Sequence, residues 1–262
     1  MKEESLEKSF DRLTYSESDA IAWISLNRPE KLNAMDDLTL AELKTAFTRA
    51  AAITSIKVIA LGGEGKDFCS GLDLSALRRI AEASASENLE DARSMMELFL
   101  QMRALPKPIV ALVRGRALAG GCGLASACDL ILASDDAQFG YVEVKIGFAA
   151  AIVMAILRRS VGEKRACELL VSGATISAAE AAKIGLVNHV FPASDFQQRA
   201  VEWLSRLVVN SSSAMMLTKQ LLYQIDGMTL EQSMRCGMDV NTLARMTEDC
   251  KEGVARFLSR KG

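Results

Sequence analysis

Small residues are concentrated in one short stretch of this sequence, residues 115–129, with glycine at positions 115, 120, 121 and 123. The stretch lies where an apolar strand pattern gives way to a helix pattern, and the first N–H groups of a helix have no partners inside it. Because glycine has no Cβ, a ligand could approach this backbone closely, and such a corner can hold a negatively charged oxygen. From these residues alone, a helix start packed tightly against a neighbouring strand explains the glycines equally well.

A second segment, residues 67–74, favours the first interpretation. It follows a strand-like run at 56–61 and a glycine pair at Gly62 and Gly63, so it could bring another exposed N–H group to the same place. Two converging N–H groups form an oxyanion hole, which stabilises a carbonyl oxygen that becomes negative during a reaction.

Glu143 is the candidate proton carrier near that corner. It follows residues 139–142 and precedes an apolar helix start, a setting that could bury its carboxyl group and raise its pKa towards the working pH. A general acid or base needs such a pKa. The alternative is a surface glutamate paired with Lys145, which is the commoner fate of a glutamate.

The composition excludes several classes of protein. The chain has 262 residues, of which 50% are hydrophobic, enough for one α/β domain with a helical appendage. Its net charge of -2, from 31 basic and 33 acidic residues, argues against nucleic-acid binding. The first residues alternate in charge, unlike a secretory signal, and the apolar run at 146–157 is shorter than the ~20 residues that span a bilayer. We therefore expect a soluble cytoplasmic protein with no membrane partner.

Neither a disulfide framework nor a metal site is expected. The six cysteines include no Cys-x-x-Cys pair, and they are expected to be buried thiols. His189, the single histidine, lies among apolar residues without a cluster of other ligands at metal-binding spacing. Its expected role is structural.

Strand patterns dominate the first half of the chain and helix patterns the second. Strands are expected at 21–26, 56–61, 109–113 and 129–133. Helices are expected at 36–52, 89–105, 149–159, 163–171, 178–184, 196–210, 214–224, 230–246 and 247–260. Residues 80–88 are expected to form a mobile loop or short helix that could close over a substrate. Periodicity alone does not separate this order from an ordinary three-layer α/β fold.

Five motifs occur in the order found in one enzyme family. They lie at residues 27–34, 68–74, 106–111, 115–129 and 139–147. In these motifs the chain resembles the crotonase superfamily, in particular its enoyl-CoA hydratase/isomerase group. The resemblance implies an α/β fold in which residues 1–195 form a spiral core of ββα turns with the acyl-CoA site. Residues 196–262 would form a C-terminal helical region that mediates trimerisation, in a homotrimer or hexamer.

The same resemblance implies roles for individual residues. Leu72 and Gly120 would donate the two N–H groups of the oxyanion hole, and Glu143 would move the proton. The residues implied at the CoA moiety are Glu30, Lys31, Leu32, Ser70 and Asp73, with Phe257 and Arg260 of the last helix reaching the nucleotide, in one arrangement from an adjacent subunit. Lys31 could equally be a solvated surface lysine. Coenzyme A would enter as part of an acyl-CoA thioester substrate, with no separate cofactor and no metal.

Two departures from the family pattern bear on the reaction. Position 123 is glycine, where hydratases of the two-glutamate type carry their second glutamate, and residues 149–151 are alanines where relatives often have proline and glycine. The favoured activity is hydration of an enoyl-CoA, including branched or unsaturated acyl groups, with one glutamate. Double-bond isomerisation is the alternative, followed by acyl-CoA decarboxylation or thioester hydrolysis on the same fold. A catalytically silent acyl-CoA-binding or structural subunit would be a different class.

Overall fold

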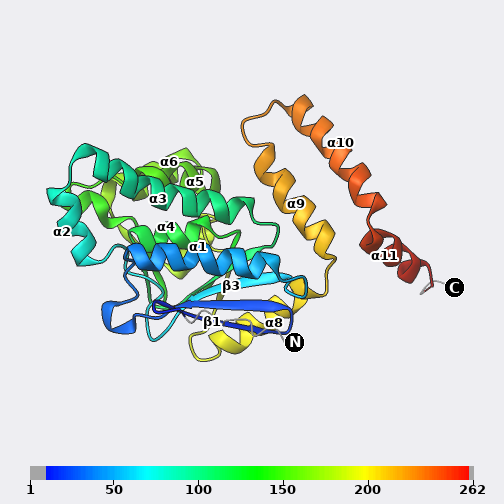
Figure 1. Ribbon diagram of the computed structural model, residues 1–262, viewed down its shortest axis with the longest axis horizontal. Coiled ribbons are helices and arrows are strands. Elements are labelled where there is room, and N and C mark those ends of the chain that lie inside the picture. The colour runs from blue at the N-terminus through cyan, green and yellow to red at the C-terminus, as the bar shows by residue number, and fades with distance from the viewer. Residues whose placement is uncertain (1–9, 260–262) are drawn as a thin grey trace, which may run out of the picture.

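The computed structural model describes residues 10–259, which form two sheets with helices packed around them (Figure 1). The larger, six-stranded sheet has the order β1-β2-β3-β4-β6-β9. Its strands are β1 (Leu13–Ser18), β2 (Ile21–Leu26), β3 (Val58–Gly63), β4 (Ile109–Val113), β6 (Leu130–Ser134) and β9 (His189–Phe191). Only the pair β1 and β2 is antiparallel in this sheet. The three-stranded sheet consists of β5 (Arg116–Leu118), β7 (Gln138–Gly140) and β8 (Thr175–Ser177), in that order.

Helices connect these strands and form the C-terminal end of the chain. They are α1 (Asp37–Ala52), α2 (Leu74–Glu82), α3 (Ala85–Ala104), α4 (Gly120–Ala127), α5 (Ala151–Val161), α6 (Glu163–Ser172), α7 (Ala178–Lys183), α8 (Phe196–Val208), α9 (Ser212–Gln224), α10 (Leu230–Met246) and α11 (Glu248–Ser259). Two short 3-10 helices, η1 (Pro29–Lys31) and η2 (Val142–Ile146), follow β2 and β7. Among the helices of residues 10–259, none has both the length and the apolar character needed to cross a bilayer.

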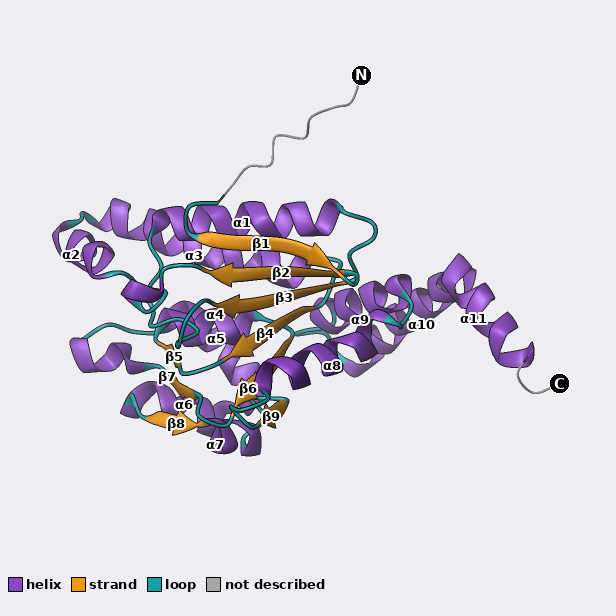
Figure 2. Cartoon of the chain, turned by 90° about the horizontal axis from the view of Figure 1, so that it is seen from below, coloured by secondary structure: helices purple, strands orange, loops and turns teal. Residues whose placement is uncertain are grey.

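Both faces of the large sheet are covered. In β3, Ile59 and Leu61 belong to an apolar cluster with residues of α1, α3 and α4, whereas Val58 and Ala60 belong to a second cluster with residues of α8. Figure 2 shows α8 in front of the sheet and α1 and α3 on its other side. Burial on two faces explains why this strand is a continuous apolar run rather than an alternating one.

Most of the long elements follow the sequence pattern, whereas β1, α2 and the short strands do not. Strands β2 and β4 and helix α10 have the predicted bounds, and Asp36 caps α1 by accepting a hydrogen bond from the amide of Thr39. The segment 80–88 consists of the end of α2 and the start of α3. Its expected mobility stays a prediction. Strand β1 was not predicted, because most of its residues are exposed and polar and show no apolar alternation. Strands β5, β7, β8 and β9 were not predicted either, because three residues carry too little periodicity to be recognised and their pairing is set by tertiary contacts.

Some cysteines and the histidine are more exposed to solvent than the sequence predicts. All six thiols are free, and Cys69, Cys122 and Cys128 are buried, but Cys167 is exposed. His189 is exposed at the start of β9, where its ring centroid lies 5.3 Å from that of Trp203. In the described part of the chain, no group of three or more side chains could hold a metal ion.

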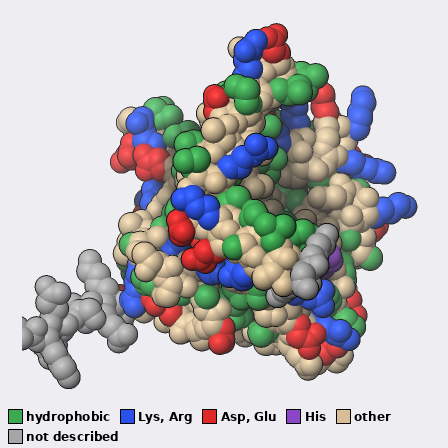
Figure 3. All heavy atoms as spheres, turned by 90° about the vertical axis from the view of Figure 1, so that its right-hand side faces the viewer, with side chains coloured by type: hydrophobic (Ala, Val, Ile, Leu, Met, Phe, Trp, Pro, Cys, Tyr) green, Lys and Arg blue, Asp and Glu red, His purple; other side chains and the backbone are tan. Residues whose placement is uncertain are grey.

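Beyond α9, helices α10 and α11 extend away from the body of the molecule (Figure 1). Helices α10 and α11 contain no buried residue, and Figure 3 shows hydrophobic side chains between charged ones on this side. Their exposed apolar residues are Leu230, Met234, Met238, Leu243, Met246, Val254, Phe257 and Leu258. The division into a core, 1–195, and an oligomerisation region, 196–262, stays a prediction.

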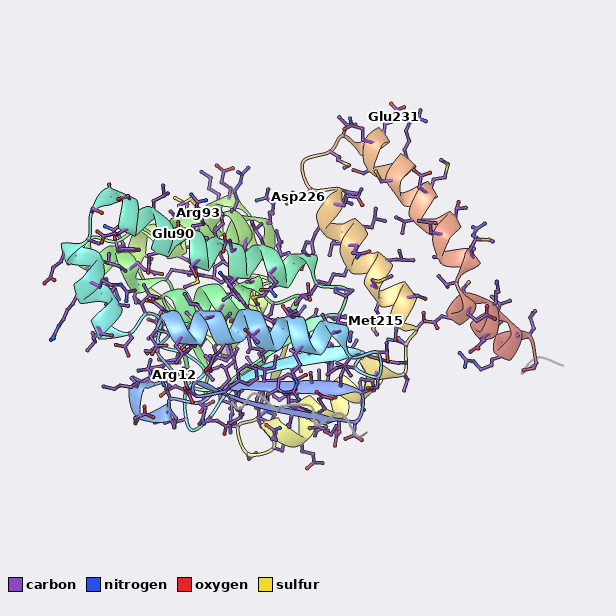
Figure 4. All side chains as sticks on the ribbon, in the orientation of Figure 1. Arg12, Glu90, Arg93, Met215, Asp226 and Glu231 are labelled. Atoms are coloured by element: carbon purple, nitrogen blue, oxygen red, sulfur yellow. The ribbon has the colours of Figure 1, made fainter. Side chains whose placement is uncertain are left out.

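A buried ion pair fixes α9 to the body. Lys219 is only 6% exposed, and its Nζ lies 2.8 Å from Asp129 Oδ2. It also donates hydrogen bonds to the carbonyl oxygens of Met102 and Lys107. Tyr223 donates to the other carboxylate oxygen of Asp129 at 2.6 Å. At the far end of α9, Asp226, labelled in Figure 4, pairs with Arg159.

We expect Lys219→Ala to destabilise the protein by about 3–5 kcal/mol, because it leaves the carboxylate of Asp129 buried without its counter-ion. The matched control is Lys44→Ala, which breaks the half-exposed pair with Glu97 and should cost at most about 1 kcal/mol. Urea unfolding of both variants measures the difference. Equal losses of stability would contradict this role of the buried pair.

Candidate active site

One pocket brings most of the predicted site residues together. It has a volume of about 880 Å³ and lies between η1, the start of α2, the inner side of α3, the start of α4 and η2. The predicted residues that line it are Glu30, Lys31, Leu32, Ser70, Leu72, Asp73, Gly120 and Glu143. Phe257 lies on α11, 59% exposed, and does not line this pocket. Arg260 lies outside the described residues.

The loop after β2 is held in place by two side chains of the first motif. Arg28 donates from Nη2 to Asp73 Oδ2 and from Nη1 to the carbonyl of Ala34, each at 2.8 Å. Asn33 donates from Nδ2 to the carbonyl of Asp67 at 2.7 Å. These bonds hold the loop in an unusual shape, in which Leu32 has a φ of 52° and Asn33 a φ of 55°. They place residues 30–32 beside residues 70–73.

Asp73 lines the pocket, but its carboxylate is already engaged. The hydroxyl and amide of Ser75 donate to Oδ1, and Arg28 donates to Oδ2. These interactions lower the pKa of Asp73 to about 2. The carboxylate therefore acts locally as the N-cap of α2.

The amide of Leu72 points away from its neighbouring chain segment. Met35 pairs with this residue in a parallel bridge, in which the Met35 amide donates to Gly71 and the Asp73 amide donates to Met35. The bridge uses the polar groups on either side of Leu72 and leaves its own N–H without a partner among residues 10–259. This is the geometry expected for a residue opposite a parallel bridge partner.

The amide of Gly120 also has no partner in the described chain. It begins α4, directly after Ala119, which has a φ of 50°. A Cβ at Gly71 would lie 2.9 Å from Ala119 Cβ and 3.4 Å from the nitrogen of Gly120, so the two segments are in contact. The residue with a positive φ at this helix start is therefore Ala119 and not Gly120, and such a φ is uncommon for a residue with a side chain. Two unpaired amides thus lie at one end of the same pocket.

Glu143 lies in the first turn of η2, partly buried. Desolvation raises the pKa of its carboxyl group, and Oε2 is buried without a hydrogen-bond partner in the described structure. Within the described residues it forms no ion pair with Lys145, which is exposed, so the structure does not show the surface pair that was the alternative. A carboxyl group in this state is suited to taking up and releasing a proton.

A hydrogen bond that was not predicted ties the segment before Glu143 to helix α4. The hydroxyl oxygens of Tyr141 and Ser126 lie 2.6 Å apart, and Ser126 also donates to the carbonyl of Cys122 in α4. The amide of Ala119 donates to the carbonyl of Gly140 at 2.8 Å. The two motifs were each recognised in the sequence, but no pattern showed that their side chains meet.

The wall beside the corner is apolar at position 123. A Cβ on Gly123 would lie 3.4 Å from both Phe99 Cζ and Val153 Cγ2. Phe99 and Met95 line the pocket from α3, and Leu77 and Ile80 line it from α2. These four residues were not predicted as site residues, although their spacing of three or four is a visible signal of one helix face.

Comparison with known proteins agrees with this arrangement. The profile of the family Enoyl-CoA hydratase/isomerase matches residues 16–262. The chain is 40% identical to a Thermus thermophilus protein provisionally named an enoyl-CoA hydratase, over 92% of this chain and 95% of the relative. It is 33% identical to the 2,3-dehydroadipyl-CoA hydratase of Escherichia coli, over 95% of this chain and 96% of the relative.

Solved structures share the fold over nearly the whole chain. The crystal structure of an enoyl-CoA hydratase from Mycobacterium smegmatis matches with a TM-score of 0.91 and 31% identity, covering 95% of this chain and 96% of that one. The structure of human enoyl-coenzyme A hydratase domain-containing protein 3 matches with a TM-score of 0.90 and 28% identity, covering 95% and 98%. The mixed α/β architecture and the ordered motifs agree with these matches. The chain therefore has the crotonase fold and belongs to the enoyl-CoA hydratase/isomerase family of enzymes.

Proposed function

We propose that this protein hydrates a 2-enoyl-CoA, with the amides of Leu72 and Gly120 holding the thioester oxygen and Glu143 moving the proton. The observation that carries the proposal is that one pocket holds two amides and a buried carboxylate oxygen that have no partners in the described structure. Buried polar groups are normally paired, so a set of unpaired ones in a cleft marks the place of a ligand.

The proposed reaction follows from these groups. The two amides polarise the thioester carbonyl and stabilise the negative oxygen that forms when water adds to the β-carbon. The carboxylate of Glu143 takes a proton from the attacking water, and the same carboxyl group then delivers a proton to the α-carbon. One carboxylate is enough for this cycle, because it is regenerated at the end.

The CoA moiety is proposed to lie at the end of the pocket formed by η1. Lys31 is the one basic residue among the described residues that line the pocket, which favours contact with a phosphate over a purely surface role. We propose that Glu30, Leu32 and Ser70 contact the rest of the CoA moiety of the substrate. Phe257 and Arg260 would contribute from a neighbouring subunit.

Double-bond isomerisation is a second candidate, favoured by the wall at Gly123. Phe99 and Val153 offer no polar group that could hold a water molecule opposite Glu143. A shift of a double bond needs one carboxylate to carry a proton between two carbons and needs no water. Hydration remains the first proposal, because the relatives described above are named as hydratases.

We expect Gly71→Ala to lower kcat/KM for crotonyl-CoA by about 100-fold, the loss typical of removing one oxyanion-hole donor. Gly71 has a φ of +107°, and the added Cβ would meet Ala119 at 2.9 Å, so the two amides can no longer keep their positions. The matched control is Gly227→Ala, which has a φ of +86° with no atom within 4 Å of the added Cβ. It should keep its activity, and equal activity of the two variants would argue against the proposed hole.

We expect Glu143→Gln to lower kcat by at least about 100-fold while changing KM little, because it removes proton transfer but keeps the shape of the side chain. Glu163→Gln, an exposed change at the start of α6, is the control and should leave both constants unchanged. Steady-state kinetics with purified protein decides the point. Turnover like that of the wild type in Glu143→Gln would remove this residue from the mechanism.

The raised pKa of Glu143 also fixes the sign of two pH effects. The kcat/KM of the wild type should fall as the pH drops through this raised pKa, because the base becomes protonated. Stability changes in the opposite sense: burial disfavours the ionised form, so folding gains stability below the ordinary pKa of glutamate and loses it as the pH rises through the folded pKa. At neutral pH, Glu143→Gln should therefore have a Tm at least as high as that of the wild type.

Gly123→Glu distinguishes hydration from isomerisation. The new Cβ would lie 3.4 Å from Phe99 Cζ and from Val153 Cγ2, so a small movement of these two side chains makes room for this atom. If the enzyme already hydrates its substrate with one carboxylate, the variant should hydrate crotonyl-CoA no faster than the wild type. A clear rise in hydration, measured together with the isomerisation rate, would favour the isomerase alternative.

We propose a homotrimer or hexamer, since α10 and α11 carry exposed apolar residues and bury none within one chain. Sedimentation at micromolar concentration should show three or six subunits. A monomer that is fully active at this concentration would contradict both the assembly and the proposed contribution of Phe257 to a neighbouring site.

A further inference from the structure

One face of α3 lines the pocket along its length, from the start of α4 at Gly120 to the far end of the pocket. Phe99, Met95, Asp91 and Asn88 line the pocket and are spaced by three or four residues, so they lie on one side of the helix. Met95 Cε would be 3.9 Å from a Cβ at Gly120, which places this end of the face beside the oxyanion hole. At 1.5 Å per residue, Asp91 lies about 6 Å and Asn88 about 10 Å further along the helix axis.

The composition of this wall changes along its length. Near the corner it is apolar, with Phe99 and Met95 on α3. At the far end, the residues contributed by α3 are polar and acidic. An extended acyl chain that leaves the oxyanion hole along α3 therefore crosses apolar surface first and ends beside the carboxylate of Asp91.

A second cavity, of about 820 Å³, adjoins this far end and shares Ile80, Asn88 and Asp91 with the pocket. Its acidic lining residues are Asp37, Glu82, Glu87, Glu90 and Asp91. The only basic residue among its described lining is Arg79, whose Nη2 lies 2.7 Å from Asp37 Oδ1 and 3.3 Å from Asp91 Oδ1. Figure 4 labels Glu90 on α3 together with Arg93, which pairs with it at 3.4 Å. The single guanidinium in the cavity is thus already shared by two carboxylates.

We propose that this acidic rim excludes acyl groups that end in a carboxylate, so that the enzyme accepts CoA thioesters with uncharged acyl chains. The inference rests on the proposed function of the pocket and specifies its substrate class. A second carboxylate on the substrate would arrive beside Asp91, where negative charge is in excess and the available cation is occupied. An uncharged chain of the same length meets no such repulsion, and selection of this kind works by penalising the wrong ligand.

The first test compares two saturated thioesters that differ only in the terminal group, hexanoyl-CoA and adipyl-CoA, by calorimetry. We expect hexanoyl-CoA to bind at least about tenfold more tightly, which corresponds to a modest repulsion. The same preference should appear in kcat/KM for 2-hexenoyl-CoA over 2,3-dehydroadipyl-CoA, and it should weaken at high salt because the rim is open to solvent. Equal or tighter binding of adipyl-CoA would overturn the inference. This result is expected if Arg79 leaves Asp37 and Asp91 and binds the carboxylate of the substrate instead.

Two variants test which carboxylate causes the preference for hexanoyl-CoA over adipyl-CoA. Asp91→Asn removes the one carboxylate shared by both cavities and should reduce the preference for hexanoyl-CoA at least about threefold. Asp37→Asn is the matched control, because it takes the same charge from Arg79 and from the second cavity but does not line the acyl pocket. It should change the preference less than Asp91→Asn does. An unchanged preference in Asp91→Asn would overturn the assignment to this residue.

The same measurements distinguish failure of the proposed function from failure of this inference. If neither saturated thioester binds and 2-hexenoyl-CoA is not converted, the proposed function fails and the inference fails with it. If 2-hexenoyl-CoA is converted and the charged analogue is used equally well, only the inference fails.

Discussion

The proposed site depends on two backbone amides that have no partner in the described structure. A parallel bridge between Met35 and Leu72 uses the polar groups on both sides of Leu72, and a helix start frees the amide of Gly120. Neither position relies on its side chain. What matters is that the contact at Gly71 keeps the two segments adjacent, and that contact is possible only for a residue without a Cβ. Amides that are already aimed at one place need no rearrangement to bind a negative oxygen.

Two carboxylates of the same pocket show how environment assigns different roles to one kind of group. Asp73 accepts hydrogen bonds at both oxygens, which lowers its pKa to about 2 and keeps it ionised as a helix cap. Glu143 has a buried oxygen without a partner in the described structure, and desolvation raises its pKa. The first is stabilised in its ionised form, whereas burial shifts the second towards its neutral form. Groups whose pKa values are moved in opposite directions commonly divide structural and proton-transfer work in this way.

Sequence reasoning reached the parts of the site that lie in local motifs. The resemblance of the ordered motifs to one family implied Leu72 and Gly120, and the structure brings both into one pocket with Glu143. Strands β2 and β4 follow from apolar runs. It did not reach contacts between motifs. The hydrogen bond from Tyr141 to Ser126 and the meeting of Phe99 with Gly123 join segments that are distant in sequence, and nothing local encodes the distance between them. The three-residue strands were missed for the same reason, since their existence depends on partners supplied by the folded chain.

The tie between α4 and η2 has a mechanical consequence. The start of α4 is joined to the segment before Glu143 by the amide of Ala119, which donates to Gly140, and again by the hydroxyls of Tyr141 and Ser126. The helix that presents the amide of Gly120 and the turn that presents the carboxylate are therefore coupled as one body. Neither of these bonds involves α2 or α3, which form the outer walls of the pocket. In the proposed mechanism, the spacing between the amide and the carboxylate is therefore set independently of the walls that contact the acyl group.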